Sequence, residues 1–194
     1  LWNGIVYATT NYKQKDSLIH INLSTIEYKD LVYRRSKGKN FILKHYPQES
    51  YPLYFNVQII IKDKEENYLL GLTGQKTIEE KGLITFVGGT VRKSKNYILQ
   101  EINDLDKYAL DEIEEETHIE INPKRLIRKG LVCGKETITF IYEYEHEGPL
   151  SVELLKIGEF SRGTILRKSE LIANTTTLNP RALDIINCIK NNYV

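Results

Sequence analysis

Five carboxylates lie within six positions in the segment ALDEIEEETHI, residues 109–119, and a single isoleucine interrupts them. On a helix, side chains three and four residues apart share a face. Glu112, Glu115 and Glu116 have this spacing, so a helix would project their carboxylates together. Like charges at such spacings destabilise a bare helix. The segment therefore calls for either a bound cation or a fully solvated surface.

A divalent cation is the counter-charge that best suits carboxylate oxygens alone. Such sites favour hard ions, Mg²⁺ or Mn²⁺, which often bridge to the phosphates of a substrate. The alternative is a solvated helix face, because glutamate has a good helix propensity. We assign Asp111 and Glu114 to a solvated face. Ala109, Ile113 and Thr117 form a neighbouring stripe that can face a sheet.

Two glycines stand upstream of the acidic segment. In LITFVGGTV, residues 83–91, a strand pattern runs into Gly88 and Gly89, and a tight turn is the simplest interpretation. Arg92 and Lys93 follow, with Lys95 close by. Cations beside a metal site could bind phosphate oxygens, whereas an ordinary exposed basic loop is the alternative.

Together, the strand, the Gly-Gly turn, the loop and the helix with its E-x-x-E-E triplet resemble the Nudix hydrolase family. The second half of the family pattern falls on residues 111–119. The hairpin pattern NVQIIIKDKEENYLLGL before it, two strand patterns after it and a final apolar-faced helix occur in the family's order. The resemblance covers roughly residues 55 to 192.

The chain departs from the family pattern at several positions. Asp111 replaces an arginine that the resemblance implies would hold a neighbouring carboxylate. His118 replaces the glycine that ends the helix, a position that prefers a left-handed conformation. Val87 replaces the proline before Gly-Gly. The spacing is longer too, so that the family's leading glycine and early glutamate fall on Tyr97 and Asn103.

The resemblance implies Mg²⁺-dependent (or Mn²⁺-dependent) hydrolysis of a nucleoside diphosphate linked to another moiety. It implies that Glu112, Glu115 and Glu116 are the catalytic and metal-binding residues. Gly88, Gly89 and Arg92 would contact the substrate. Loop acids that could take the proton from water are Glu147, Glu153 and Glu159. The departures motivate an alternative, a non-catalytic Nudix-fold module that binds or senses a nucleotide.

The composition of the chain limits the classes of partner that it is expected to bind. The net charge of +1 provides no field that would draw the chain to nucleic acid or to an anionic membrane, so an RNA-processing role is disfavoured. No apolar run approaches the roughly 20 residues that span a bilayer. Cys133 and Cys188 sit in apolar contexts, which predicts reduced, buried thiols and a cytoplasmic protein. A small-molecule nucleotide is the expected partner, and the family likeness is compatible with a homodimer.

The predicted class is α+β, with a Nudix-like mixed β-sheet flanked by helices and an N-terminal extension. We expect residues 1–54 to be an extension packed on the same domain and residues 55–194 to be the Nudix-like domain. Strands are predicted at 16–24, 40–46, 55–63, 68–74, 83–91, 125–134 and 137–146, and a loop region at 147–160. Helices are predicted at 24–35 with Ser24 as its cap, from Asp104 to about Thr117, and from Pro180 to 192 with Asn179 as its cap.

Overall fold

The computed structural model describes residues 4–16, 18–45, 51–74, 82–93, 98–134, 137–158, 160–173 and 177–190. Its strands are β1 (Ile5–Lys15), β2 (Leu18–Glu27), β3 (Leu53–Lys62), β4 (Asn67–Thr73), β5 (Ile84–Thr85), β6 (Val87–Thr90), β7 (Arg92–Lys93), β8 (Leu126–Cys133), β9 (Thr137–Glu145) and β10 (Phe160–Arg167). Its α-helices are α1 (Tyr28–Lys37), α2 (Lys39–His45), α3 (Ile102–Glu116), α4 (Lys168–Ala173) and α5 (Pro180–Lys190).

A mixed sheet is built around β3. One side of β3 pairs in parallel with β9 from Tyr54 to Lys62, and β9 pairs antiparallel with β8. The other side pairs antiparallel with β1 at its start, with β6 in its middle and with β4 at its end. The sheet then extends from β4 to β10 and from β1 to β2. The predicted class, a mixed sheet flanked by helices, is confirmed.

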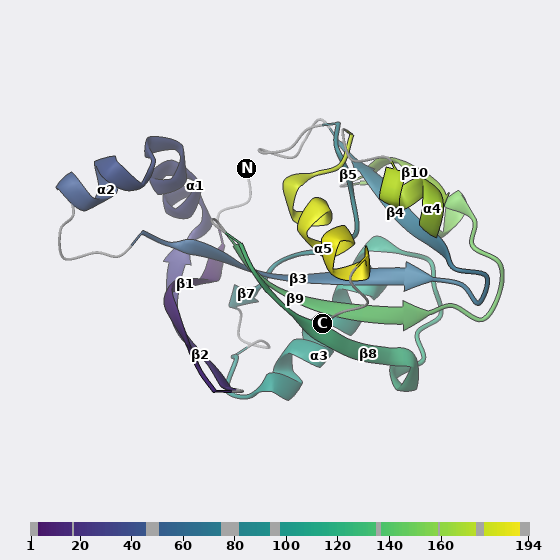
Figure 1. Ribbon diagram of the computed structural model, residues 1–194, viewed down its shortest axis with the longest axis horizontal. Helices are drawn as coiled ribbons and strands as arrows, with labels where there is room; N and C mark the ends of the chain where they lie inside the picture. Colours follow the sequence, from purple (N-terminus) through teal and green to yellow (C-terminus); the bar gives the residue numbers. More distant parts are fainter. Residues whose placement is uncertain are drawn as a thin grey trace.

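Helices cover both faces of this sheet (Figure 1). Alternate residues of a strand point to opposite faces, so Val57 and Ile59 join the core under α3 while Ile60 joins the core under α5. Leu105, Tyr108, Ala109 and Ile113 provide the apolar face of α3. Ala182, Ile185, Ile186 and Ile189 provide that of α5. The sheet therefore fixes α3, with its acidic side, against β3 and β6.

The N-terminal residues continue the same sheet. Val6 and Ala8 pack with Leu31 of α1 and Tyr54 of β3 in a small core of their own. Tyr7, which points to the other face, joins the core under α3. Figure 1 places α1 and α2 at one end of the molecule, beside β1 and β2. β3 begins at Leu53, so the expected boundary at 54/55 falls at its first residues; the division into extension and domain stays a prediction.

Two predictions near the N-terminus are wrong, the Ser24 cap with the helix start at 24 and the strand at 40–46, whereas β2 and α1 overlap the strand predicted at 16–24 and the helix predicted at 24–35. Ser24 does not cap a helix, because β2 runs on to Glu27 and the Ser24 hydroxyl donates to the Ala8 carbonyl of β1 at 3.3 Å. The segment 40–46, predicted as a strand, lies largely in α2. Its short apolar run fits both the helical and the strand period, and the pattern alone does not distinguish a helix from a strand.

Other differences lie at strands that the sequence pattern did not reveal. β1, which precedes every predicted strand, was not expected. The predicted loop at 147–160 contains the short 3₁₀ helix Val152–Leu154, and β10 and α4 follow it. After its first residue, Phe160, β10 continues with serine, arginine and glycine, which break the alternation by which strands are recognised. The predicted start of α5 at Pro180 is confirmed, and the Asn179 side chain accepts from the Ala182 amide at 3.4 Å.

The acidic helix begins earlier than predicted and ends about where predicted. It starts at Ile102, because the Asp104 carboxylate accepts from the backbone amides of Gln100 and Glu101 at 2.7 and 2.9 Å. It ends at Glu116, and Thr117 is extended with φ −132°. His118 does not take the left-handed conformation that we expected, since among the described residues only Asp16 and Glu66 combine a side chain with positive φ. Instead its amide donates to the Leu154 carbonyl at 2.7 Å.

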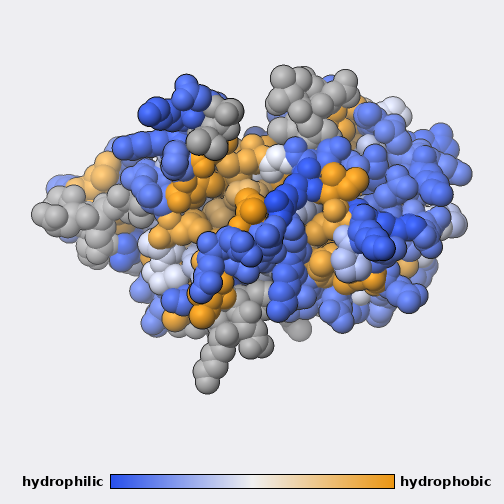
Figure 2. Space-filling view, turned by 90° about the horizontal axis from the view of Figure 1, so that it is seen from below, coloured by the Kyte–Doolittle hydropathy of each residue, from blue (hydrophilic) through white to orange (hydrophobic). Residues whose placement is uncertain are grey.

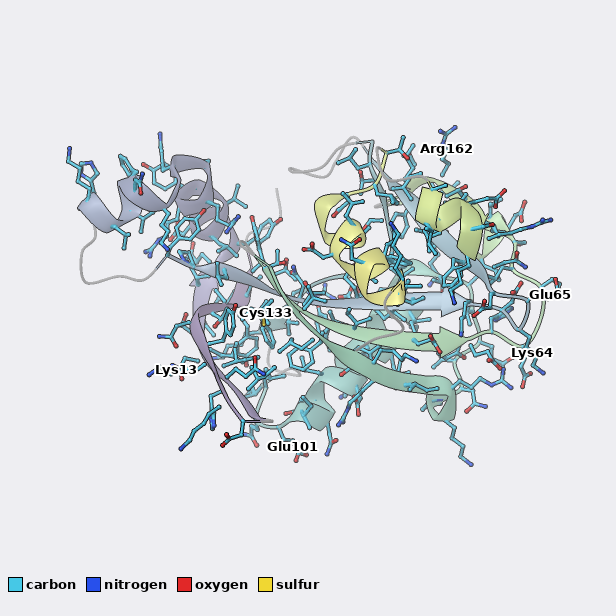
Figure 3. All side chains as sticks on the ribbon, viewed as in Figure 1. Lys13, Lys64, Glu65, Glu101, Cys133 and Arg162 are labelled. Carbon is cyan, nitrogen blue, oxygen red and sulfur yellow. The ribbon has the colours of Figure 1, made fainter. Side chains whose placement is uncertain are left out.

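The surface mixes apolar and polar side chains on the face shown in Figure 2. Four of the large apolar side chains that remain exposed belong to the β1–β2 hairpin: Ile5, Tyr12, Ile19 and Leu23. Cys133, at the end of β8, is a free, half-buried thiol (Figure 3). The side chain of Cys188 lies outside the described residues. None of the helices in the described part of the chain has the length and apolar character needed to cross a lipid bilayer.

Candidate active site

Three glutamates of α3 differ in their burial. Glu112 and Glu116 are buried, with 5% and 7% of their surface exposed, although both carry carboxylates. The Glu115 side chain remains 54% exposed. A buried carboxylate is costly unless it is hydrogen-bonded or paired with a cation. The partners of Glu112 and Glu116 therefore reveal what this side of α3 is built to hold.

The Gly-Gly segment is the first of these partners. Gly88 and Gly89 lie in β6, opposite Gln58 and Val57 of β3. The Gly88 amide donates to Glu116 Oε2 at 3.0 Å. Gly88 has φ +125°, and a Cβ there would lie 2.3 Å from the Val57 carbonyl oxygen. A Cβ on Gly89 would lie 3.3 Å from Glu112 Oε2. Glycine is thus needed at position 88, and at 89 it leaves room for the helix carboxylate.

Arg92 is the second partner. It lies on β7, just beyond the Gly-Gly segment. Its Nη2 atom is 2.7 Å from Glu115 Oε2 and 3.5 Å from Glu112 Oε1. The Arg92 side chain is 34% exposed, so this ion pair lies at the rim of the site rather than in the core. A guanidinium at this position offsets the repulsion between two carboxylates that share one helix face.

Tyr108, one turn before Glu112, completes the group. Its hydroxyl donates to the Thr90 carbonyl at 3.0 Å, and its ring centroid lies 5.9 Å from the Arg92 guanidinium carbon. Burial, and after it the Glu112 charge, raises the pKa of Tyr108, which therefore stays protonated. Burial acts to lower the pKa of Arg92, but Tyr108, Glu115 and Glu112 outweigh it and raise that pKa. Arg92 is a permanent cation here.

The six residues that the sequence singled out lie in one place. Glu112, Glu115 and Glu116 come from α3, Gly88 and Gly89 from β6, and Arg92 from β7. Sequence reasoning missed Tyr108, and it treated Arg92 only as a substrate contact. This chain has Asp111 where the Nudix pattern carries an arginine on the helix, and Arg92 contacts Glu112 and Glu115 from the sheet.

The remaining sequence candidates are less closely tied to this group. Glu147 forms an ion pair with Arg125 beyond the end of β9. Glu153 lies exposed on the short 3₁₀ helix. Lys93 is exposed on β7. Glu159 and Lys95 lie outside the described residues.

The donor set suits a hard divalent cation, but its present spacing does not. All three candidate ligands are carboxylates, and the Glu112 carboxylate lies so close to Gly89 that a Cβ there would be 3.3 Å from Oε2. Within the described ranges, however, no three carboxylate, histidine or cysteine side chains come close enough together to hold one ion. Arg92 lies against two of the three glutamates. In this arrangement Arg92 occupies carboxylate oxygens of Glu112 and Glu115 that a metal ion would need.

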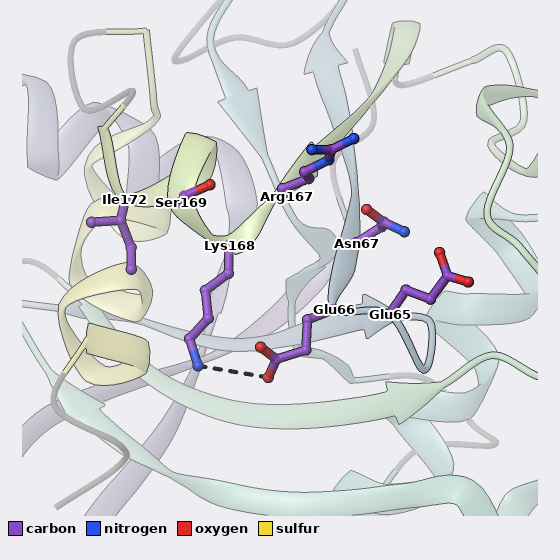
Figure 4. Close-up of a pocket in the computed structure, with 7 residues that line it drawn as sticks. All are labelled: Glu65, Glu66, Asn67, Arg167, Lys168, Ser169 and Ile172. Atoms are coloured by element: carbon purple, nitrogen blue, oxygen red, sulfur yellow. Dashed lines mark ion pairs between the residues drawn. The ribbon is translucent and has the colours of Figure 1, made fainter.

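A separate surface pocket lies at the β3–β4 turn and α4, and none of its lining residues belongs to α3 (Figure 4). Residues of both charges line it, among them Glu65, Glu66, Arg167 and Lys168. Lys168 Nζ and Glu66 Oε1 are 3.6 Å apart across it. Because its charges neutralise one another at the surface, this pocket lacks the excess of positive charge that a phosphate ligand requires.

Comparison with solved structures identifies the fold. The Nudix domain of NrtR from Shewanella oneidensis, in complex with ADP ribose, aligns with a TM-score of 0.55 and 13% identity, over 80% of this chain and 99% of that one. The MutT protein of Methanosarcina mazei aligns with a TM-score of 0.52 and 15% identity, over 73% and 96% of the two chains.

A third similar structure comes from a longer protein. It is a bifunctional NMN adenylyltransferase/ADP ribose pyrophosphatase of Francisella tularensis, in complex with AMP and a manganese ion. The TM-score is 0.53 and the identity 14%; the alignment covers 86% of this chain but only 49% of that protein. No family model matches the sequence, and no curated protein matches it significantly. At these identities the comparisons show the fold: the chain has the Nudix fold.

Proposed function

We propose that this chain, which has the Nudix fold, is a Nudix-type pyrophosphohydrolase that cleaves a nucleoside diphosphate linked to another moiety. One observation carries the proposal: two buried glutamates, Glu112 and Glu116, face the Gly88–Gly89 segment, and Arg92 reaches the same place. Burying carboxylates in this way is costly for a fold that does not use them. Clusters of this kind are typical of reaction centres.

Hydrolysis of a diphosphate requires groups that balance the negative charge around the attacked phosphorus atom. Water attacks one phosphorus of the diphosphate, the bridging P–O bond breaks, and the leaving phosphate departs with the bond's electrons. In this proposal Arg92 binds the phosphate oxygens, since a guanidinium matches their geometry with two parallel hydrogen bonds. A carboxylate of the α3 group takes the proton of the attacking water. The Gly88 amide holds Glu116 in place through its hydrogen bond.

Mg²⁺ or Mn²⁺ is the proposed cofactor, and Glu112, Glu115 and Glu116 are the residues that would hold it. When bound, such an ion neutralises phosphate charge and lowers the pKa of a coordinated water. A nucleotide-like small molecule is the proposed substrate, as the ligands named for the similar structures suggest. A homodimer and a cytoplasmic location remain part of the proposal.

The test is an assay of phosphate or nucleotide release from a panel of nucleoside diphosphate derivatives, with Mg²⁺ or Mn²⁺. We expect Glu115→Gln and Glu116→Gln each to lower the rate by about 100-fold or more, as loss of an acid–base or ion-binding group does. Glu114→Gln is the matched control, because Glu114 is exposed on the same helix, and it should keep the parent rate. If no substrate is cleaved, or if all three variants behave alike, the enzyme proposal fails.

A second candidate is a nucleotide-binding module without hydrolysis. The contact that favours it is the Arg92 bridge, which neutralises Glu112 and Glu115 without any external ion. In that case ADP-ribose would raise the melting temperature and would be recovered intact after prolonged incubation with Mg²⁺. Cleaved product that disappears with Glu116→Gln would exclude this candidate.

A further inference from the structure

The guanidinium of Arg92 and a divalent cation would use the same oxygens. Nη2 of Arg92 contacts Glu115 Oε2 and Glu112 Oε1, at 2.7 and 3.5 Å. Two cations that share these carboxylates would repel each other strongly at such distances. An ion that binds to Glu112 and Glu115 must therefore displace the arginine, or the arginine must leave first.

The backbone of Arg92 cannot provide that movement easily. β7 pairs with β1, where Val6 lies opposite Arg92. On the preceding residue, the Val91 carbonyl accepts from Tyr7 at 2.8 Å and the Val91 amide donates to Phe55 at 2.9 Å. The backbone is thus held from both sides, and the long, partly exposed side chain is the part that is able to move.

Deprotonation of Arg92 does not remove its competition with a metal ion for the carboxylates either. Arginine stays protonated at any pH that a folded protein tolerates. Lysine or histidine at this position could release a proton to make way for a metal ion, but a guanidinium does not. What can draw Arg92 away from the glutamates is another anion, and a diphosphate offers oxygens that pair with a guanidinium at two points.

We propose that Arg92 is a built-in competitor of the metal ion, so that a divalent cation binds to Glu112, Glu115 and Glu116 together with a diphosphate anion rather than before it. The anion pairs with Arg92, and the carboxylates released in this way accept the cation. The inference rests on the proposed function for the identity of the two ligands. By linkage, each ligand then raises the affinity for the other.

The test measures bound Mn²⁺ through the enhancement of water proton relaxation, a signal specific to protein-bound ion, on the full chain without any substrate. The parent protein should bind Mn²⁺ weakly alone and about tenfold more tightly with methylenediphosphonate, which cannot be hydrolysed at its bridge. Arg92→Gln should bind Mn²⁺ about tenfold more tightly than the parent without the diphosphonate. Arg92→Met, which keeps the apolar stem near Tyr108, should do the same if the glutamine variant is unstable.

Two controls locate the effect. Lys93→Gln removes the same charge from the neighbouring residue of β7, whose side chain points to the opposite face, and should bind Mn²⁺ as the parent does. Adding Glu115→Gln to Arg92→Gln should abolish the gain in affinity. The inference is overturned if parent and Arg92 variants bind Mn²⁺ alike, if Lys93→Gln matches Arg92→Gln, or if the gain survives loss of Glu115.

This measurement separates the inference from the proposed function. If no nucleotide derivative is hydrolysed but Arg92→Gln binds Mn²⁺ more tightly, the enzyme proposal fails and the competition stands. If hydrolysis depends on Glu115 and Glu116 while the Arg92 variants bind Mn²⁺ like the parent, the enzyme proposal stands and the competition fails.

Discussion

At the scale of single residues, the carboxylates of α3 differ in the groups that contact them. Glu116 is held by the Gly88 amide, and Glu112 lies beside Gly89 and Arg92. Glu115, the most exposed of the three, is held by Arg92. Glu114, on the same helix, is solvated. Neighbouring acids of one short segment therefore have different environments, although their side chains are identical.

The two glycines should respond differently to alanine. Gly88→Ala would place a Cβ 2.3 Å from the Val57 carbonyl at φ +125°, so we expect a loss of about 3 kcal/mol in the free energy of unfolding. Gly89→Ala would bring a Cβ to 3.3 Å from Glu112 Oε2. It should cost less than about 1 kcal/mol, yet lower hydrolysis because it shifts Glu112. Urea denaturation measures the first effect and the rate assay the second.

A different ranking would contradict this account of the glycines. If Gly89→Ala were the more destabilising change, the close approach of β6 to β3 at Gly88 would be wrong. If Gly89→Ala left the rate unchanged, Glu112 would not need the space that Gly89 leaves.

At the scale of elements, the turn between β3 and β4 depends on one carboxylate. Asp63 accepts from the Glu65 and Asn67 amides at 3.0 and 2.9 Å and from the Asn67 side chain at 2.9 Å. Desolvation acts to raise the pKa of Asp63, but the hydrogen bonds from Asn67, Glu65 and Leu150 outweigh it, and the pKa is lowered. The ionised form of Asp63 thus stabilises the folded hairpin.

Asp63→Ala should therefore destabilise the protein by about 1–3 kcal/mol at pH 7, the cost of losing bonds to a charged acceptor. A carboxyl whose pKa is depressed on folding contributes stability above its unfolded pKa, near 4, and that contribution is lost as the pH falls through the lower, folded value. The difference between Asp63→Ala and the parent should thus shrink below about pH 4. Denaturant titrations across pH 3 to 7 measure it, and a pH-independent difference would contradict the assignment.

At the scale of the whole molecule, the N-terminal strand β1 contributes to two cores, the one under α1 and the one under α3. Val6 and Ala8 pack under α1, whereas Tyr7 enters the core beneath α3. The Tyr7 hydroxyl also accepts from the Leu99 amide at 2.9 Å, just before α3. The described residues between Gly4 and Tyr54 therefore share both a sheet and a core with the rest of the chain.

This sharing predicts one cooperative unfolding transition. Calorimetry should give a van't Hoff enthalpy equal to the calorimetric enthalpy, as for a single domain. Tyr7→Phe should shift that single transition by about 1 kcal/mol, the worth of one hydrogen bond, without splitting it in two. A separate early transition that Tyr7→Phe leaves unmoved would show that the N-terminal residues form an independent unit.

Much of the fold could be predicted where local patterns are strong. The apolar runs of β3, β4, β8 and β9 and the periodic face of α5 identify their own elements. The segment 40–46 was misassigned because a run of seven residues fits both the helical and the strand period. β10 was missed because Ser161, Arg162 and Gly163, which follow its buried first residue Phe160, break the alternating apolar pattern. The N-terminal pairing could not be predicted, since register between distant strands leaves no local mark.

By itself, the sequence determined that three glutamates share one face of a helix, because helical periodicity follows from spacing alone. It also placed two glycines and an arginine a short distance upstream of that helix, although the turn expected at Gly88 and Gly89 is part of strand β6 instead. Only the tertiary structure decided that Gly88 donates to Glu116 and that Arg92 pairs with Glu112 and Glu115. Those contacts depend on how β6 and β7 pair with β3 and β1, and such pairing is fixed by the packing of the whole sheet rather than by any one segment.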